Sequence, residues 1–124
     1  MSKAKLLIAE DNKNNFLLIE WVLKDEYQIL RASDGDETLR LFETEHPDVI
    51  LMDVKMPVMD GIMATKIIRE KNADIPIIAL TAQAYESDRQ MAFDAGCNGF
   101  ISKPINVSDF RKELDEILEK VKNK

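Results

Sequence analysis

Five short apolar runs, separated by segments of helical periodicity, constrain the fold of this chain more than any other feature. The runs predict strands near residues 5–9, 28–32, 48–52, 76–80 and 99–102. The remaining segments predict helices near residues 14–24, 36–45, 61–71, 85–95 and 107–121. Regular alternation of strands and helices favours a parallel sheet with helices on both faces. We therefore predict a doubly wound α/β fold.

The apolar content of the predicted strands and the positions of the glycines agree with this fold. The run 49–52 is apolar throughout, as expected for a parallel strand covered on both faces. The run 28–32 is more mixed and suits the edge of the sheet. Gly61 follows Asp60 before one predicted helix, and Gly96 is placed to end another in a left-handed cap.

Length, composition and charge narrow the class of protein. The 124 residues, 45% hydrophobic and 32% charged, suit one globular domain spanning 1–124. The net charge of -6 argues against direct binding of nucleic acid, which relies on clustered Lys and Arg. The apolar runs are far shorter than the ~20 residues that span a bilayer. Since Cys97 is the only cysteine, we expect no internal disulfide and a cytoplasmic location.

Polar groups follow four of the predicted strands at the point where each strand ends. Glu10 and Asp11 follow the first strand. Asp53 closes the third, Thr81 the fourth and Lys103 the fifth. Ligands of an open parallel sheet bind outside the carboxyl ends of its strands, so we expect these groups to converge.

This set of groups predicts a metal-assisted phosphoryl site. Mg²⁺ prefers oxygen ligands, which Glu10, Asp11 and Asp53 supply. Without metal, the carboxylates would repel one another and at least one pKa would rise. Asp53 can attack a phosphoryl group to form an acyl phosphate. Lys103 and the Thr81 hydroxyl would then neutralise the peripheral oxygens of that group.

Two prolines bear on the loops around this site. Pro57 limits how far the segment after Asp53 can rearrange. Pro104 has a structural role, because the Lys103–Pro104 peptide bond can be cis at a cost of only ~0.5–1 kcal/mol. A cis bond there would aim the Lys103 side chain back over the strand ends.

Four segments closely resemble the receiver domain of two-component response regulators: residues 9–12, 51–61, 80–82 and 96–105. The resemblance covers essentially the whole chain and is nearest to receivers that work with hybrid histidine kinases. It implies a flavodoxin-like (βα)5 sheet with strand order 2-1-3-4-5. It also implies a phosphorelay switch whose partner-binding surface changes on phosphorylation.

The resemblance further implies partners and a ligand set. Asp53 would receive its phosphoryl group from a histidine kinase or a histidine phosphotransfer protein. Glu10, Asp11, Asp53 and the backbone carbonyl of Lys55 would hold Mg²⁺. The domain would support its own phosphorylation and autodephosphorylation without being an enzyme on external substrates. Its downstream protein target is left open.

Three positions bear on how such a switch would work. Phe100 stands where the family often has a tyrosine that turns inward on activation, so a switch here would rest on packing of the ring toward Thr81. Lys55 lies two residues after Asp53, and Gln83 lies two residues after Thr81. We expect both to tune how fast water reaches the acyl phosphate, with the sign left open.

The first predicted helix carries more apolar residues than its core stripe needs. That stripe consists of Leu18, Ile19, Val22 and Leu23. Phe16, Leu17 and Trp21 fall on flanking or opposite positions, and exposed groups of this kind often mark a protein contact. We predict that they dock the phosphodonor, because family members commonly meet histidine-bearing helices there. Partial burial against a neighbouring helix is the alternative.

Two other classes of protein fit the residues less well. A phosphohydrolase of the haloacid dehalogenase type would want an aspartate two residues after its nucleophile, where this chain has Lys55. A flavodoxin-like cofactor binder would offer Ser, Thr and Gly donors after its first strand. Glu10 and Asp11 would instead repel a phosphate there.

Overall fold

The computed structural model describes residues 3–56, 58–81 and 86–122, in which strands and helices alternate as predicted. The strands are β1 (Ala4–Ala9), β2 (Tyr27–Ala32), β3 (Val49–Asp53), β4 (Ile77–Thr81) and β5 (Gly99–Ser102). The helices are α1 (Lys13–Leu23), α2 (Gly35–Glu45), α3 (Gly61–Lys71), α4 (Glu86–Ala95) and α5 (Val107–Lys122). All strand pairs are parallel, and the order β2-β1-β3-β4-β5 confirms the predicted topology.

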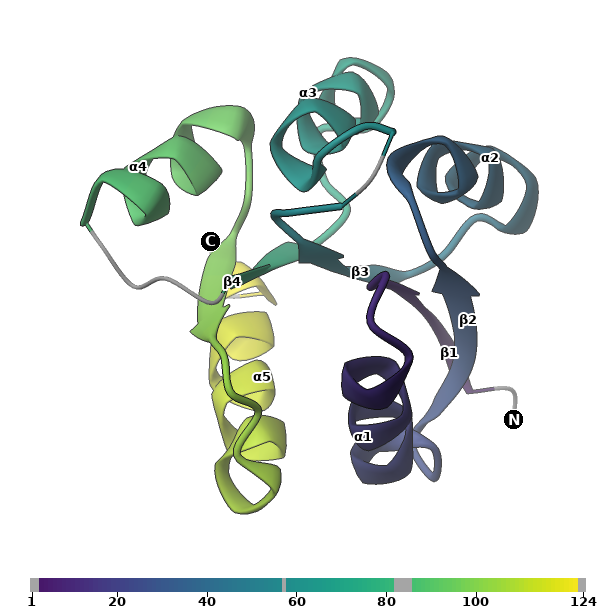
Figure 1. Cartoon of the computed structure of the whole chain (residues 1–124), viewed down its shortest axis with the longest axis vertical. Coiled ribbons are helices and arrows are strands. Elements are labelled where there is room, and N and C mark those ends of the chain that lie inside the picture. The colour runs from purple at the N-terminus through teal and green to yellow at the C-terminus, as the bar shows by residue number, and fades with distance from the viewer. Residues whose placement is uncertain (1–2, 57, 82–85, 123–124) are drawn as a thin grey trace.

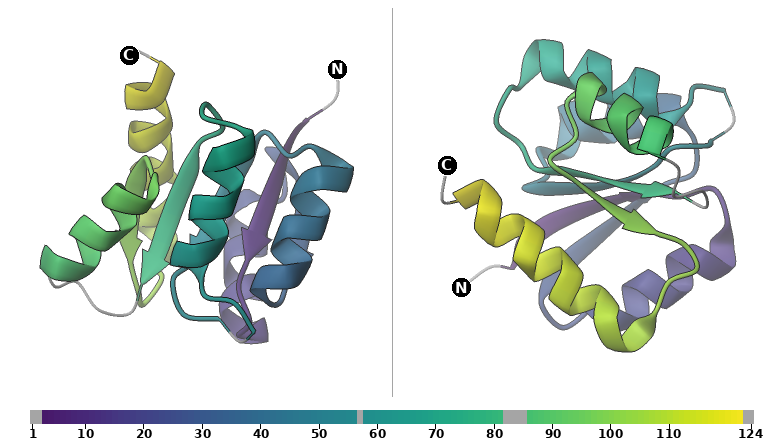
Figure 2. Two further views of the ribbon diagram at one scale, coloured as in Figure 1. Left: turned by 90° about the horizontal axis from the view of Figure 1, so that it is seen from above. Right: turned by 90° about the vertical axis from the view of Figure 1, so that its left-hand side faces the viewer.

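The sheet lies between two layers of helices. Helices α1 and α5 cover one face, and α2, α3 and α4 cover the other (Figures 1 and 2). Successive residues of each strand therefore enter different cores. In β1, for example, Leu6 and Ile8 pack toward α1 and α5, whereas Leu7 and Ala9 pack toward the opposite layer.

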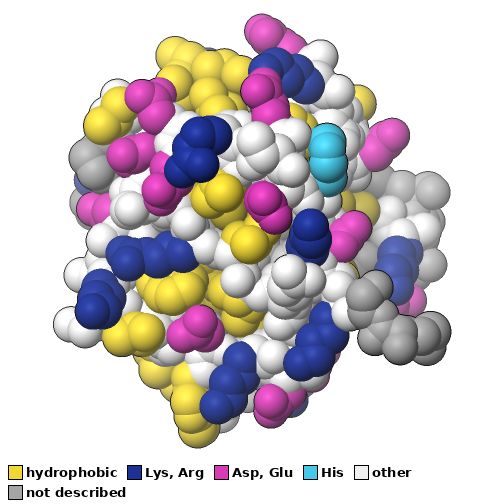
Figure 3. Space-filling view, turned by 90° about the vertical axis from the view of Figure 1, so that its right-hand side faces the viewer, with side chains coloured by type: hydrophobic (Ala, Val, Ile, Leu, Met, Phe, Trp, Pro, Cys, Tyr) yellow, Lys and Arg dark blue, Asp and Glu magenta, His cyan; other side chains and the backbone are white. Residues whose placement is uncertain are grey.

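Burial varies across the sheet as the sequence predicts. Every residue of β3 and β4 is buried, whereas β2 lies at the edge and is mostly half-buried. On the face shown in Figure 3, which carries His46, Lys and Arg side chains are interspersed with Asp and Glu. Positive charge therefore does not gather into one patch on that face.

Side-chain caps mark the starts of α1, α2 and α3. The caps Asn12, Asp34 and Asp60 accept hydrogen bonds from the backbone N–H groups of Asn15, Glu37 and Met63. Gly61, which begins α3, packs so tightly that a Cβ there would lie 2.1 Å from the Asp53 carbonyl oxygen. At the end of α4, Gly96 has a φ of 118°, so the glycine is needed there.

Helix α1 corrects one of the sequence predictions. Leu17 and Trp21 are 44% and 63% exposed, in agreement with the predicted patch. The prediction that Phe16 belongs to it is wrong, because Phe16 is only 9% exposed. Phe16 lies three residues before Ile19 and seven before Leu23, and this spacing turns it to the core face.

None of the helices in the described part of the chain combines the length and apolar character that a membrane span requires.

Candidate functional site

The carboxyl ends of the strands meet at one edge of the sheet, where their arrowheads point the same way (Figure 2, left). Glu10 follows β1, Asp53 ends β3, Thr81 ends β4 and Lys103 follows β5. Glu10, Asp53 and Thr81 are 0%, 4% and 6% exposed, whereas Asp11 is exposed. The edge therefore holds carboxylates that are largely withdrawn from water.

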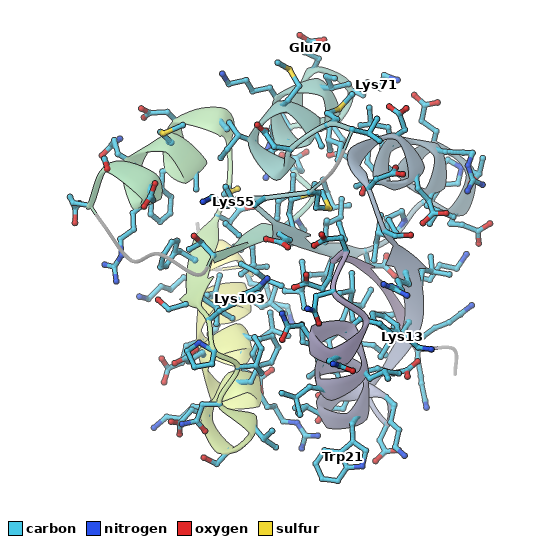
Figure 4. The ribbon with its side chains drawn as sticks, in the orientation of Figure 1. Lys13, Trp21, Lys55, Glu70, Lys71 and Lys103 are labelled. Carbon is cyan, nitrogen blue, oxygen red and sulfur yellow. The ribbon has the colours of Figure 1, made fainter. Side chains whose placement is uncertain are left out.

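Lys103 joins two of these carboxylates. Its Nζ atom donates a hydrogen bond to Asp53 Oδ2 at 3.2 Å and lies 2.7 Å from Glu10 Oε1. The contact with Glu10 is an ion pair without good hydrogen-bond alignment. The Lys103 backbone N–H donates to the Thr81 carbonyl at 2.7 Å, and the bond to Pro104 is cis, as predicted. In Figure 4 the Lys103 side chain points toward the centre of the molecule, whereas Trp21 points away from it.

The three predicted metal ligands lie together. Glu10, Asp11 and Asp53 each offer a carboxylate oxygen, and these oxygens lie within 4.8 Å of one another. A hard divalent cation such as Mg²⁺ fits this donor set, because all three ligands are oxygens. Their combined negative charge is also larger than the positive charge that Lys103 supplies. The position of the Lys55 carbonyl as a fourth ligand stays a prediction.

Burial and crowding shift the titration of the site. Burial, followed by the hydrogen bond and charge of Glu10, raises the pKa of Asp53 to about 7, while Lys103 and the Lys55 N–H oppose the rise. Burial lowers the pKa of Lys103, but the contacts with Glu10 and Asp53 outweigh it and raise that pKa overall. The metal-free site therefore holds a proton on Asp53 more readily than an exposed carboxyl group does.

Backbone contacts fix the loop that leaves Asp53. The Lys55 N–H donates to Asp53 Oδ1 at 3.1 Å, and the Lys55 side chain is exposed. The Gly61 N–H donates to the Val54 carbonyl at 2.9 Å and closes the loop at the start of α3. These bonds leave Asp53 Oδ2 facing Lys103.

The predicted switch residue Phe100 is half-buried on β5. Its partner in the register is Ala79 of β4, and the Arg89 guanidinium of α4 lies 4.9 Å from its ring centroid. Packing of the ring toward Thr81 on activation stays a prediction. Gln83 and Pro57 lie outside the described residues.

Sequence reasoning missed one residue near the site. Arg31 of β2 donates to the backbone carbonyls of Glu10 and Asp11 at 3.2–3.4 Å. Its guanidinium also lies 5.1 Å from the centroid of the Phe16 ring. The sequence showed only that Arg31 is a basic residue near the end of the predicted edge strand. Basic residues are common on exposed edge strands, so this position did not point to the site.

Comparison with known proteins agrees with this geometry. Residues 6–115 match the family model of the response regulator receiver domain. The chain is 36% identical to the polar-differentiation response regulator DivK of Brucella ovis, over 91% of this chain and 94% of that protein. It is 32% identical to the transcriptional regulatory protein PhoP of Bacillus subtilis, over 94% of this chain. The chain spans about half the length of PhoP and of two similar transcriptional regulators.

The chain also superposes on solved structures of receiver domains. The receiver domain of the sensor histidine kinase PA1611 from Pseudomonas aeruginosa, 35% identical, superposes with a TM-score of 0.85 over 95% of this chain and 99% of that one. That structure holds a magnesium ion in its active-site cleft. The chemotaxis protein CheY4 of Vibrio cholerae, 30% identical, gives 0.88 over 94% of this chain and 99% of that one. This chain therefore belongs to the receiver domains of two-component response regulators, which act as phosphorylation-dependent switches.

Proposed function

We propose that the chain accepts a phosphoryl group on Asp53 from a phosphohistidine, with Mg²⁺ bound beside it. The observation that carries the proposal is the nearly buried Asp53 carboxylate, hydrogen-bonded to Lys103 and grouped with the Glu10 and Asp11 oxygens. An Asp53 oxygen attacks phosphorus, a P–O bond forms, and the P–N bond to the imidazole breaks with its electron pair leaving on nitrogen. The product is an acyl phosphate on Asp53.

The chain's own groups are suited to the charge that this transfer moves. Lys103 already donates to Asp53 Oδ2, so its ammonium is placed to pair with an oxygen of the incoming phosphoryl group. Thr81, buried at the end of β4, brings a hydroxyl to the same edge. Phosphoryl transfer depends mainly on positioning and charge neutralisation, and these two residues supply both.

We propose Glu10, Asp11, Asp53 and the Lys55 carbonyl as the groups that hold Mg²⁺. When bound, the ion supplies positive charge that offsets the crowded carboxylates and the phosphoryl oxygens. The magnesium ion in the cleft of the PA1611 receiver domain supports this assignment. Burial and the neighbouring Glu10 raise the pKa of Asp53 to about 7 even with Lys103 beside it, which fits a carboxylate cluster that one ammonium does not neutralise.

The direct test is a mass measurement. The intact protein, incubated with Mg²⁺ and a small acyl-phosphate donor, should gain one phosphoryl group. Asp53→Asn should gain none, and chelation of the metal should prevent the gain in the original protein. An unchanged gain in Asp53→Asn would place the phosphate elsewhere and refute the assignment.

The phosphodonor docks, in this proposal, on the exposed side of α1. Leu17 and Trp21 are exposed there. A groove of about 450 Å³ adjoins Trp21, passes Val107 at the start of α5 and reaches Arg111. Arg111 donates to the Val22 carbonyl at 2.6 Å and so holds α5 against α1. An apolar helix face carrying the phosphohistidine fits this surface, with the family's histidine kinases and phosphotransfer proteins as donors.

The docking surface can be separated from the chemistry. Leu17→Ala combined with Trp21→Ala should slow phosphotransfer from a protein donor but leave labelling by the small donor unchanged. Met91→Ala on α4, also an exposed apolar side chain, serves as the matched control. Equal rates from the protein donor in all three proteins would remove α1 as the docking site.

The remaining roles concern the lifetime and output of the phosphorylated state. We propose that Lys55 and Gln83 tune autodephosphorylation and that Phe100 changes its packing on phosphorylation. The altered surface would then be read by a downstream protein in the cytoplasm. Phosphate loss from Lys55→Ala, followed by intact mass over time, tests the first of these roles. A lifetime equal to that of the original protein would exclude Lys55.

A further inference from the structure

The loop that joins β1 to α1 carries two of the site's carboxylates but little regular structure. The Glu10 N–H donates to the Ala32 carbonyl at 3.0 Å and makes the last backbone bond between β1 and β2. Beyond it the chain bends, and α1 begins only at the cap Asn12. The backbone orientation of Glu10 and Asp11 therefore depends on contacts other than the backbone hydrogen bonds of the sheet and the helix.

Arg31 supplies such contacts from β2. Its Nε and one terminal nitrogen each lie 3.4 Å from the Glu10 carbonyl, and that terminal nitrogen lies 3.2 Å from the Asp11 carbonyl. These bonds are long, and each alone is weak. A planar guanidinium nevertheless engages two successive carbonyls at once, which fixes the direction of the peptide between them.

A second contact orients the guanidinium itself. In the sheet, Arg31 is paired with Ile8, on the side that faces α1 and α5. Its guanidinium lies 5.1 Å from the centroid of the buried Phe16 ring. This geometry allows a cation–π contact, so Arg31 ties the edge strand, the loop and α1 together at one point.

We propose that Arg31 is a positioning residue for the metal-binding carboxylates. By holding the Glu10 and Asp11 carbonyls, it keeps their side chains turned toward Asp53. Among the described residues, Arg31 forms hydrogen bonds to backbone carbonyls and none to Asp53 or to a carboxylate oxygen, so it acts through the backbone. The proposal rests on the proposed function, because it assumes that these carboxylates hold Mg²⁺.

Charge and positioning predict opposite results when Arg31 is removed. A cation beside a metal site repels the metal, so loss of charge alone would tighten Mg²⁺ binding. Loss of positioning would weaken binding, because outer partners of metal ligands contribute to affinity. Lysine at this position keeps the charge but cannot reproduce the planar fork, so it separates the two effects.

The experiment is a calorimetric Mg²⁺ titration of the original protein, Arg31→Ala, Arg31→Lys and Lys13→Ala. Lys13→Ala is the matched control, since it removes an exposed cation from the start of α1. We expect roughly tenfold weaker binding in both Arg31 variants, the lower end of the effect of outer-shell partners, and less than a twofold change in Lys13→Ala. Unchanged or tighter binding in Arg31→Ala would overturn the proposal.

A metal-free measurement separates this proposal from the proposed function. Amide NMR spectra recorded in chelator should show shifts at residues 10–12 in both Arg31 variants, with the rest of the spectrum retained. If the original protein binds no Mg²⁺, the proposed function fails, and the spectra still decide whether Arg31 orients the loop. Spectra unchanged at residues 10–12 would overturn the role of Arg31.

Discussion

Polar clusters lie at both ends of the strands of the sheet, and they differ in how well their groups are paired. The acceptor cluster, at the carboxyl ends, consists of Glu10, Asp11, Asp53 and Lys103. It sets the buried carboxylates of Glu10 and Asp53 and the exposed carboxylate of Asp11 against one ammonium. Burial, followed by the neighbouring Glu10 carboxylate, raises the pKa of Asp53.

The arginine cluster, at the amino ends of β4 and β5, consists of Arg69, Asn72, Gly96, Asn98 and Ile77. Arg69 donates to the Gly96 carbonyl at 2.8 Å, to the Asn72 carbonyl at 3.1 Å and to Asn98 Oδ1 at 2.8 Å. Asn98 Oδ1 also accepts from the Ile77 N–H, and the Asn98 N–H donates to the Ile77 carbonyl. Nearly every group in this cluster has a partner.

This difference in pairing indicates that the arginine cluster stabilises the fold, whereas the acceptor cluster serves the function. Paired polar groups hold α3, β4 and β5 together at one end of the sheet. Unbalanced carboxylates at the other end cost stability until a cation offsets their negative charge. Removing a member of the arginine cluster should therefore destabilise the protein, and removing a carboxylate of the acceptor cluster should stabilise it.

The largest effect is expected from Arg69→Ala. This change leaves the Gly96 and Asn72 carbonyls without their donor and takes one of two bonds from Asn98 Oδ1. We expect a loss of about 2–3 kcal/mol in the free energy of unfolding, because the half-buried Gly96 and Asn98 groups each lose a hydrogen bond, whereas water can replace Arg69 at the exposed Asn72. Urea denaturation of the metal-free protein measures it.

Arg40→Ala is the control for that experiment. Arg40 is an exposed residue of α2 whose ion pair with Glu37 lies at the surface. Such pairs contribute roughly 0–1 kcal/mol, so the control should stay close to the original protein. Equal losses in the two variants would mean that the arginine cluster contributes no more than a surface contact.

Asp53→Asn should act in the opposite direction. It removes a buried negative charge beside Glu10 and leaves Lys103 paired with Glu10. In chelator at pH 8 we expect a gain of roughly 1–2 kcal/mol in the free energy of unfolding, since the ionised Asp53 no longer has to be buried. Added Mg²⁺ should then stabilise the original protein and not the variant. A variant less stable than the original in chelator would contradict the imbalance.

The stability difference between Asp53→Asn and the original protein should depend on pH. The folded-state pKa of Asp53, about 7, lies above the unfolded value, so the folded protein holds this proton more tightly. The stability that the protonated group contributes is present at low pH and is lost as the pH rises toward 7. The gap between Asp53→Asn and the original protein should therefore shrink between pH 7 and about 4. Urea denaturation across this range measures the gap, and a constant gap would exclude Asp53 as its source.

Local sequence signals could predict the acceptor cluster and a parallel α/β fold, whereas the strand order was implied by the family resemblance. Alternating apolar runs set the strands to within a residue or so, and parallel topology brings the residues after Ala9, Met52, Leu80 and Ser102 to one edge. The spacing on α1 likewise predicted that Leu17 and Trp21 are exposed. Phe16 was misplaced because its helical angle lies near the boundary between the core and exposed faces.

Neither the arginine cluster nor the role of Arg31 had such a signal. Arg69 meets Asn98 across 29 residues of sequence, and Arg31 meets Glu10 across 21. Each pairing depends on the final packing of separate elements and on long flexible side chains. An arginine in a helix or an edge strand is ordinarily a solvated surface residue, so its sequence position says little about its partner.

The smallest effect on the free energy of unfolding is expected from Thr65→Val, on the same helix as Arg69. Thr65, fully buried on α3, lies 3.9 Å from the Cys97 sulfur, which is a weak partner. We expect Thr65→Val to change the free energy of unfolding by less than about 0.5 kcal/mol, because so little hydrogen bonding is lost.

Burial raises the pKa of Cys97 to about 11, and the Thr65 contact opposes that rise. The variant should therefore form its thiolate at a higher pH, as followed by ultraviolet absorbance. A stability loss as large as that of Arg69→Ala would show that the hydroxyl–sulfur contact contributes as much here as the Arg69 guanidinium.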